Sequence, residues 1–297
     1  MPHYKMLYFL YKIGEFLAFR LPSGLFYRLA DFLGSVYFII ARKSRNTVFA
    51  NMRVILKYIS SSNHVSYKSR MVFVNFARYL AEFFRSPKID LEYIANQINF
   101  TGKEHLEQAL AKGRGVLLLS AHMGSWEMGA IVLSMRGYKI NVVAWTHRDR
   151  RINDFFLKRR QNKGVQVIPL GSGIKRVFTA LKNNEIVAIL GDIDYGALKA
   201  GITVKLFGQD TVIPRGPALF SLRTGAPIVP IFVHWQKDGK IAVSLQQELF
   251  YKPCGDIETD VINLAAKIAE VIEKNIAQYP EQWLMFASRW DDVKTIK

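Results

Sequence analysis

The sequence is short of cysteine and lacks the common metal and nucleotide motifs. Its single cysteine, Cys254, cannot form an internal disulfide bond, which suits a reducing compartment. With no histidine nearby, we interpret it as an incidental thiol rather than a nucleophile. There is no Cys/His cluster with zinc spacing, no G-x-x-x-x-G-K-[S/T] loop and no G-x-G-x-x-G fingerprint. The sequence therefore predicts no metal site and no bound nucleotide cofactor.

Acidic residues are also scarce. The chain has 24 Asp and Glu residues against 41 Lys and Arg residues, a net charge of +17, although 50% of its residues are hydrophobic. This imbalance predicts an anionic partner: nucleic acid, an anionic lipid headgroup or an acidic carrier protein. No helix-turn-helix, zinc-finger or RNA-binding aromatic signature is present, so we expect no nucleic acid partner. A non-enzymatic basic protein that binds membrane or nucleic acid is an alternative supported by charge alone.

The chain has no linker rich in Ser, Gly or Pro, no low-complexity tract and no internal repeat. A single α/β domain of 297 residues is common. We therefore divide the chain into an N-terminal extension, 1–45, and one globular domain, 46–297. No small-residue cleavage site follows the apolar N-terminal stretch, so we do not expect a removed signal peptide.

The N-terminal extension is rich in Leu, Phe, Tyr and Ile, but its longest uncharged stretch is short. That stretch, Phe32–Ala41, falls below the roughly 20 residues that a membrane span needs. Leu25–Ala41 could just span a bilayer if its two charged residues lie near the interface. The basic run Arg42–Arg45 would then mark the cytoplasmic end. The alternatives are a helix lying in the membrane interface and a helical hairpin packed on the globular domain. The aromatic content favours membrane contact.

Hydrophobic periodicity after the extension alternates between helical and strand patterns. We expect strands at 115–120, 139–145, 165–169, 186–190, 228–234 and 240–247, and helices at 64–98, 102–112, 126–135, 150–162, 174–182, 216–223 and 260–277. Alternation of this kind predicts an α/β fold, a mixed sheet flanked by helices.

The segment that follows the strand expected at 115–120 is the best clue to chemistry. Sheets of this class bind ligands beyond the carboxyl ends of their strands. In a continuous helix, side chains five residues apart diverge by about 140°, so His122 and Glu127 can meet only across a turn, which Gly124 can supply. Glu127 would then hold one imidazole nitrogen and leave the other as a general base. The alternative is a polar strand-end histidine followed by an acid favoured at a helix N-terminus.

Several motifs, in order along the chain, resemble those of the late acyltransferases of lipid A biosynthesis, within the glycerolipid acyltransferase superfamily. The segment from His122 to Glu127 resembles the H-x-G-N-W-E form of the H-x-x-x-x-[D/E] motif, with Ser125 in place of Asn. Further segments resemble the R-x-x-x-x-x-N entry region (Arg45 and Asn51), D-Q-D-Y-G (Asp192–Gly196, with Ile193 for Gln), F-F-G (Leu206–Gly208, with Leu206 for the first Phe), P-x-G-x-A (Pro214–Ala218), T-G-A-P (Thr224–Pro227) and P-E-Q-W (Tyr279–Leu284). The resemblance runs from about residue 20 to residue 290.

The resemblance implies acyl transfer from a thioester to a hydroxyl group of a lipid. His122 would take the hydroxyl proton as the oxygen attacks the thioester carbonyl, and Glu127 would fix the ring tautomer. The expected donor is an acyl-carrier-protein thioester, with acyl-CoA as the alternative; no metal, cofactor or covalent acyl-enzyme is required. The expected acceptor is a lipid A precursor or a related anionic glycolipid, with a lysophospholipid as the runner-up. The expected location is the cytoplasmic face of the cell inner membrane.

The resemblance also implies substrate-binding residues. An arginine a few residues before a glycine, here Gly164, contributes to the family's site, and both Arg159 and Arg160 fit that description; the alternative for each is a solvated basic face. A guanidinium group suits phosphate because its planar fork pairs with two oxygens. Asp192 and Asp194 could order such an arginine or bind the acceptor's hydroxyls, and the alternative is a pair of turn acids at a strand end.

Overall fold

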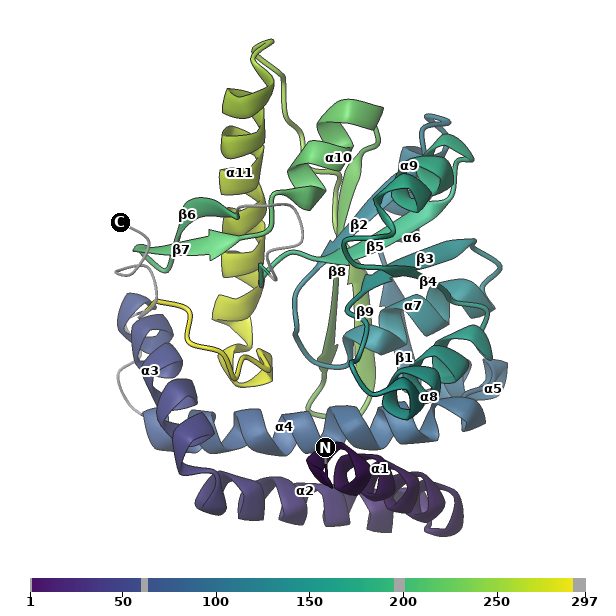
Figure 1. Ribbon diagram of the computed structural model, residues 1–297, viewed down its shortest axis with the longest axis vertical. Helices are drawn as coiled ribbons and strands as arrows, with labels where there is room; N and C mark the ends of the chain where they lie inside the picture. The colour runs from purple at the N-terminus through teal and green to yellow at the C-terminus, as the bar shows by residue number, and fades with distance from the viewer. Residues whose placement is uncertain (1, 60–63, 195–200, 291–297) are drawn as a thin grey trace.

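The computed structural model describes residues 2–59, 64–194 and 201–290. A seven-stranded sheet lies between two layers of helices, and three N-terminal helices cover one end of the molecule (Figure 1). The strand order is β1-β9-β8-β2-β5-β3-β4, and a separate hairpin pairs β6 with β7. Within the large sheet, neighbouring strands run parallel except β8 and β9. The predicted fold class, a mixed α/β sheet flanked by helices, is confirmed.

The strands are β1 Ile98–Thr101, β2 Val116–Ser120, β3 Ile140–Ala144, β4 Gln166–Pro169, β5 Ile186–Leu190, β6 Ile202–Leu206, β7 Gln209–Ile213, β8 Ile228–Trp235 and β9 Ile241–Leu245. The α-helices are α1 Pro2–Arg20, α2 Ser23–Ile40, α3 Arg42–Tyr58, α4 Val65–Arg85, α5 Leu91–Gln97, α6 Lys103–Leu110, α7 Trp126–Met135, α8 Arg150–Gln161, α9 Ile174–Lys182, α10 Gly216–Thr224 and α11 Ile257–Gln278.

Strand β2 forms the centre of the core and is buried on both faces. Val116 and Leu118 pack into the cluster that includes α6 and α7, whereas Leu117 and Leu119 pack into the cluster that includes α9 and α11. Successive side chains of a strand point to opposite faces, so a strand covered by helices on both sides needs an unbroken apolar run. The sheet thereby holds the end of β2 rigidly in place.

The three N-terminal helices pack on α4 and on one another. Gly34 of α2 lies so close to α4 that a Cβ at this position would be 2.7 Å from the Cα of Val74. Asp31 of α2 accepts two hydrogen bonds from Arg78 of α4, at 2.5 and 2.7 Å. Arg45 of α3 donates to the Ile39 carbonyl at 2.9 Å and so satisfies one of the last carbonyl groups of α2. The extension is therefore part of the folded body.

Most predicted elements agree with the structure to within a few residues, but the region after α4 differs. The single helix expected over 64–98 ends at Arg85, because a 3₁₀ turn containing Pro87 follows. Asp90 then caps α5 by accepting from the Tyr93 amide, and the chain continues directly into β1, which we did not predict. The β6–β7 hairpin was also missed. The proposed division at residue 45 falls inside α3, so the extension and the globular domain share a helix.

Candidate active site

The turn after β2 is fixed by the C-terminal segment of the chain. Gly124 has a φ of +53°, and a Cβ there would lie 2.1 Å from the Val233 carbonyl oxygen. The Gly124 amide donates to the Gln282 carbonyl, and the Leu284 amide donates to the His122 carbonyl, both at 2.8 Å. The predicted turn at Gly124 is confirmed. The P-E-Q-W segment lies against this turn and holds it through these backbone hydrogen bonds.

A carboxylate binds the His122 imidazole, but it comes from another strand. Strands β2 and β5 are parallel neighbours in which Ser120 pairs with Leu190, so two residues further on, His122 meets Asp192. Asp192 Oδ1 lies 2.8 Å from His122 Nδ1, and Oδ2 accepts the His122 amide at 2.9 Å. The Trp283 indole donates to the same Oδ2 at 2.9 Å.

These contacts keep Asp192 ionised. Its side chain is 0% exposed. Burial alone would raise the pKa of Asp192, but attraction to His122, together with hydrogen bonds from the His122 ring, the Trp283 indole and the His122 amide, outweighs burial and holds the pKa below its ordinary value. A carboxylate beside Nδ1 favours the tautomer in which Nδ1 carries the proton and Nε2 can accept one. This is the arrangement that a general base requires.

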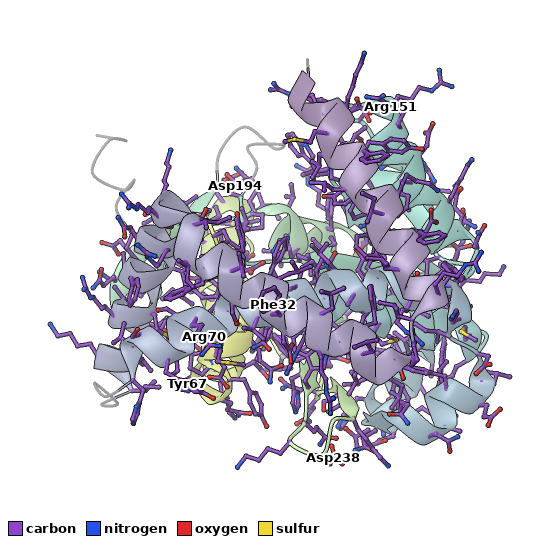
Figure 2. All side chains as sticks on the ribbon, turned by 90° about the horizontal axis from the view of Figure 1, so that it is seen from below. Phe32, Tyr67, Arg70, Arg151, Asp194 and Asp238 are labelled. Atoms are coloured by element: carbon purple, nitrogen blue, oxygen red, sulfur yellow. The ribbon has the colours of Figure 1, made fainter. Side chains whose placement is uncertain are left out.

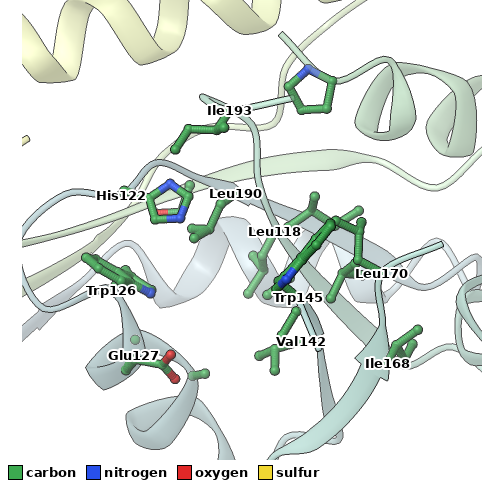
Figure 3. Close-up of a pocket in the computed structure, with 18 of the residues that line it drawn as sticks. Leu118, His122, Trp126, Glu127, Val142, Trp145, Ile168, Leu170, Leu190 and Ile193 are labelled. Atoms are coloured by element: carbon green, nitrogen blue, oxygen red, sulfur yellow. The ribbon is translucent and has the colours of Figure 1, made fainter. Parts of the chain in front are cut away.

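Glu127 has a different partner, and the predicted contact between Glu127 and the imidazole is wrong. Its two oxygens accept from Arg160, at 3.0 Å from Nε and 2.5 Å from Nη2. Figure 3 shows the Trp126 indole between the His122 ring and the Glu127 carboxylate, and Trp126 meets His122 edge-on with ring centroids 5.2 Å apart. Because α7 begins at Trp126, Glu127 turns towards α8 and not back across the Gly124 turn.

The remaining candidate residues separate into two groups. Arg160 and Asp194 line the same pocket as His122. Arg159, only 4% exposed, donates to Glu15 of α1 at 2.6 Å and to the Phe84 carbonyl at 2.8 Å. These contacts favour a structural role for Arg159 over the acceptor-binding role that we had considered. Tyr195 and Gly196 of the D-Q-D-Y-G resemblance lie outside the described residues.

The pocket is a cavity of about 560 Å³ that runs from His122 along the sheet. It is lined mainly by aliphatic and aromatic side chains, including Leu118, Leu133, Val142, Ile168, Val177 and Phe220. In Figure 3, Ile168 and Leu170 lie on the side of the pocket far from His122. The volume is that of a site for a small organic ligand or cofactor. A charged and hydrogen-bonding end next to a long apolar interior suits a molecule with a reactive head and a hydrocarbon tail.

The sequence pattern of the bacterial lipid A biosynthesis acyltransferases matches residues 1–292. The chain belongs to this family. The phosphatidylinositol mannoside acyltransferase of Mycobacterium tuberculosis (strain ATCC 25618 / H37Rv) is 29% identical over 222 residues, 73% of this chain and 68% of that protein. The lipid A biosynthesis lauroyltransferase of Escherichia coli (strain K12) is 26% identical over 286 residues, 92% of this chain and 88% of that protein. The chain is thus an acyltransferase of the family, with relatives that are named for different acceptors.

Two features of this acyltransferase were not recognised in the sequence as parts of the site. Trp283 orients Asp192, and Asn51 holds the segment after Trp283 by donating to the Ala287 carbonyl at 2.9 Å. Asn51 belongs to the R-x-x-x-x-x-N segment and Trp283 to the P-E-Q-W segment, so the resemblance to the family pointed to both residues in the sequence. Their contacts join segments more than 90 residues apart in the chain, so only the fold reveals what they do.

Proposed function

We propose that this acyltransferase moves a fatty acyl chain from a thioester to a hydroxyl group of an anionic glycolipid, at the cytoplasmic face of the inner membrane. The observation that carries the proposal is the His122–Asp192 pair at the head of an apolar cavity. The pair supplies a base for the hydroxyl group, and the cavity suits the hydrocarbon chain of the donor.

The reaction needs one proton to move from the acceptor to the leaving group. The acceptor oxygen attacks the thioester carbonyl carbon as His122 Nε2 takes its proton, and a tetrahedral intermediate forms. When the C–S bond breaks, the imidazolium returns the proton to the thiolate. Asp192 stabilises the imidazolium throughout. General-base assistance of this kind contributes roughly 10²–10⁴-fold to the rate.

A guanidinium group in the cavity wall, together with the net charge of +17, supports an anionic acceptor. Arg160 lies in the cavity wall with its guanidinium in a bidentate pair with Glu127. Burial would lower the pKa of Arg160, but attraction and hydrogen bonding to Glu127 raise it, so the group stays charged. Asp194, in the same wall, can accept from sugar hydroxyl groups. We propose a lipid A precursor or a related anionic glycolipid as the acceptor.

The net charge of +17 bears on the donor. Acyl-carrier proteins are acidic, and a basic surface speeds their encounter through long-range attraction. We therefore propose an acyl-carrier-protein thioester as the donor, with acyl-CoA as the alternative. The preference should weaken as salt is added, because salt screens interactions between exposed charges beyond about 10 Å at 0.1 M.

The test is a matrix of purified full-length protein with two donors and three acceptors. The donors are acyl-carrier-protein and CoA thioesters of one chain length; the acceptors are a lipid A precursor, a phosphatidylinositol mannoside and a lysophospholipid, with products read by mass spectrometry. We expect an acylated glycolipid, formed faster from the carrier protein. Acylation of the lysophospholipid alone would overturn the proposed glycolipid acceptor. Tight binding of nucleic acid by a protein that transfers no acyl chain would overturn the proposed function.

A further inference from the structure

We propose that the protein binds an anionic bilayer as a monotopic protein, through the outward surfaces of α1 and α2, and that α2 lies along the membrane instead of crossing it. We call this surface the α1–α2 face. Its exposed apolar residues include Phe9, Ile13 and Phe16 of α1 and Phe32, Leu33 and Ile40 of α2. Figure 2, seen from below, shows both helices at the surface, with Phe32 near the middle of α2. The proposal adds a mode of docking to the membrane location proposed above.

Helix α2 is long and apolar enough to cross a membrane by length and composition, but one such helix near an N-terminus is weak evidence. Its 18 residues give a length of about 27 Å at 1.5 Å per residue, slightly less than the roughly 30 Å of hydrocarbon in a bilayer. Length alone therefore does not distinguish a helix that crosses the bilayer from one that lies along its surface. The contacts of α2 with the rest of the protein distinguish the two.

Those contacts hold one side of α2 on α4. The pair between Asp31 and Arg78 is bidentate, and Arg70 donates to the Ser35 hydroxyl at 3.0 Å. Gly34 allows the backbones of the two helices to approach more closely than a side chain would permit. A bilayer-spanning α2 would have to leave α4, which would separate a charged pair and expose the apolar face of α4 from which α2 departed.

The chain on either side of α2 gives the stronger argument. Helix α1, which precedes α2, and helix α3, which follows it, both pack on the same body. Tyr11 of α1 lines the active-site cavity, and Glu15 is the partner of the buried Arg159. If α2 crossed the bilayer, α1 would be carried to the opposite side and Arg159 would be left buried without its carboxylate. Breaking a buried pair in this way is strongly destabilising. Both ends of α2 therefore stay on one side of the membrane.

Charge identifies a bilayer as the partner. Residues 1–58 contain nine basic and two acidic residues, and the two acids, Glu15 and Asp31, are both paired with arginines of the folded body. A second copy of the chain would bring the same positive charge to this face, whereas anionic headgroups would neutralise it.

Basic side chains also border the aromatic residues of α1. Lys88 lies over the Phe19 ring and Arg151 over the Tyr8 ring, with distances to the ring centroids of 5.2 and 5.3 Å. Figure 2 shows Arg151 beside the end of α1. A basic border around an aromatic and aliphatic surface is typical of proteins that lie in the membrane interface.

The first test is topology in cells, using the full chain fused at its N-terminus or its C-terminus to a fluorescent protein that folds only in the cytoplasm or to an alkaline phosphatase that is active only outside it. We expect fluorescence and no phosphatase activity at both ends. Phosphatase activity at the N-terminus alone would show that α2 spans and would overturn the proposal.

The second test is sedimentation of purified full-length protein with phosphatidylcholine vesicles, with and without 30% phosphatidylglycerol. We expect binding to the anionic vesicles, and at least a roughly tenfold loss of it in the double variant Phe9→Glu/Phe32→Glu, because two exposed rings that would enter the membrane are replaced by charges. The matched control is Phe250→Glu, at an exposed phenylalanine between β9 and α11, which should bind as the unmodified protein does.

Two outcomes of the second test would overturn the proposal. One is unchanged vesicle binding by the double variant. The other is conversion of a dimer to a monomer by the double variant with vesicle binding intact, which would make the α1–α2 face a self-association surface. Neither topology nor sedimentation uses a donor or an acceptor, so a wrong acceptor assignment would leave both readouts unaffected.

Discussion

Four polar side chains around the head of the cavity form two pairs. His122 is bound by Asp192, and Arg160 is bound by Glu127. In the proposed mechanism the first pair moves the proton. The second pair holds a guanidinium group in the cavity wall, the position proposed for contact with the acceptor. The acid of the His122–Glu127 motif therefore contacts an arginine and not the imidazole.

This division predicts which substitutions are additive. Asp192→Asn should lower kcat by about a hundredfold or more, because an amide no longer holds the tautomer or stabilises the imidazolium. Adding His122→Ala should cost little further, and Glu127→Gln with Arg160→Gln should likewise be less than additive. When a double variant has one substitution in each pair, its fold-loss in kcat should be the product of the two single fold-losses. Steady-state kinetics of the single and double variants decide, and non-additivity of Glu127→Gln with His122→Ala would restore the direct contact that we rejected.

Glu82 of α4 is a buried acid behind the catalytic turn. It accepts from the Trp235 indole, and its other oxygen, Oε2, has no hydrogen-bond partner among the described residues. Burial raises the pKa of Glu82 from 4.5 to about 7, despite the opposing effects of the Trp235 hydrogen bond and the Arg78 charge. Below pH 4.5 the carboxyl group is protonated in both the folded and the unfolded chain. Between pH 4.5 and 7 only the folded state keeps the proton, so the stability contributed by Glu82 falls as the pH rises.

We therefore expect Glu82→Gln to stabilise the protein relative to the unmodified chain at pH 8 and to have a smaller effect near pH 5. The glutamine carbonyl can still accept from Trp235, but no charge is buried at high pH. The pKa shift of Glu82 from 4.5 to about 7 corresponds to roughly 3 kcal/mol of unfolding free energy. Thermal unfolding of both proteins from pH 5 to pH 8 measures the difference, which cancels the contributions of other titrating groups. A difference independent of pH would contradict the assignment.

At the scale of elements, the β2–α7 turn is the feature on which the site depends. Gly124→Ala should destabilise the protein strongly, because the new Cβ would lie 2.1 Å from the Val233 carbonyl oxygen at a positive φ. The matched control is Gly113→Ala, which has a φ of +69° but no atom within 4 Å of the added Cβ. It should cost only about 1 kcal/mol, from the left-handed conformation alone. Thermal unfolding of the two variants compares them, and equal losses would show that the close contact is unimportant.

Local patterns predicted the elements that carry the site but not the contacts between them. The apolar run of β2 and the glycine after it indicated a strand and a turn, and both are present. The partner of His122 depends on β5 lying next to β2 with Ser120 opposite Leu190, and strand order has no local signature. Trp283 reaches Asp192 across 91 residues of sequence for the same reason. Sequence spacing favoured Glu127 as the partner of the imidazole, because spacing carries no information about the direction in which α7 points that side chain.

At the scale of the whole molecule, the N-terminal helices belong to the catalytic body. The buried Arg159 ties α1 to α8 through Glu15, and Tyr11 of the same helix lines the cavity. A face suited to a bilayer therefore lies next to the site that would use a lipid. In the proposed function, this arrangement would let a lipid acceptor stay in the membrane while its hydroxyl group reaches His122.

Removal of the Glu15 carboxylate should loosen this attachment. We expect Glu15→Gln to increase amide hydrogen exchange in α1, including the turn that contains Tyr11, because Arg159 then stays buried with a weaker partner. Glu104→Gln, on the exposed surface of α6, is the control and should leave exchange in α1 unchanged. Hydrogen exchange followed by mass spectrometry measures exchange in α1 for both variants. Unchanged exchange in α1 after Glu15→Gln would show that apolar packing alone holds the helix.

General-base catalysis by His122 is tested most directly by a single-turnover measurement of acyl transfer by purified full-length protein and by His122→Ala, with a saturating acyl-carrier-protein thioester and a lipid A precursor. The proposed mechanism predicts an acylated precursor from the unmodified protein and a rate at least about a hundredfold lower for His122→Ala, with cooperative unfolding retained in the variant. A rate for His122→Ala within about threefold of the unmodified protein would contradict a general-base mechanism at this site.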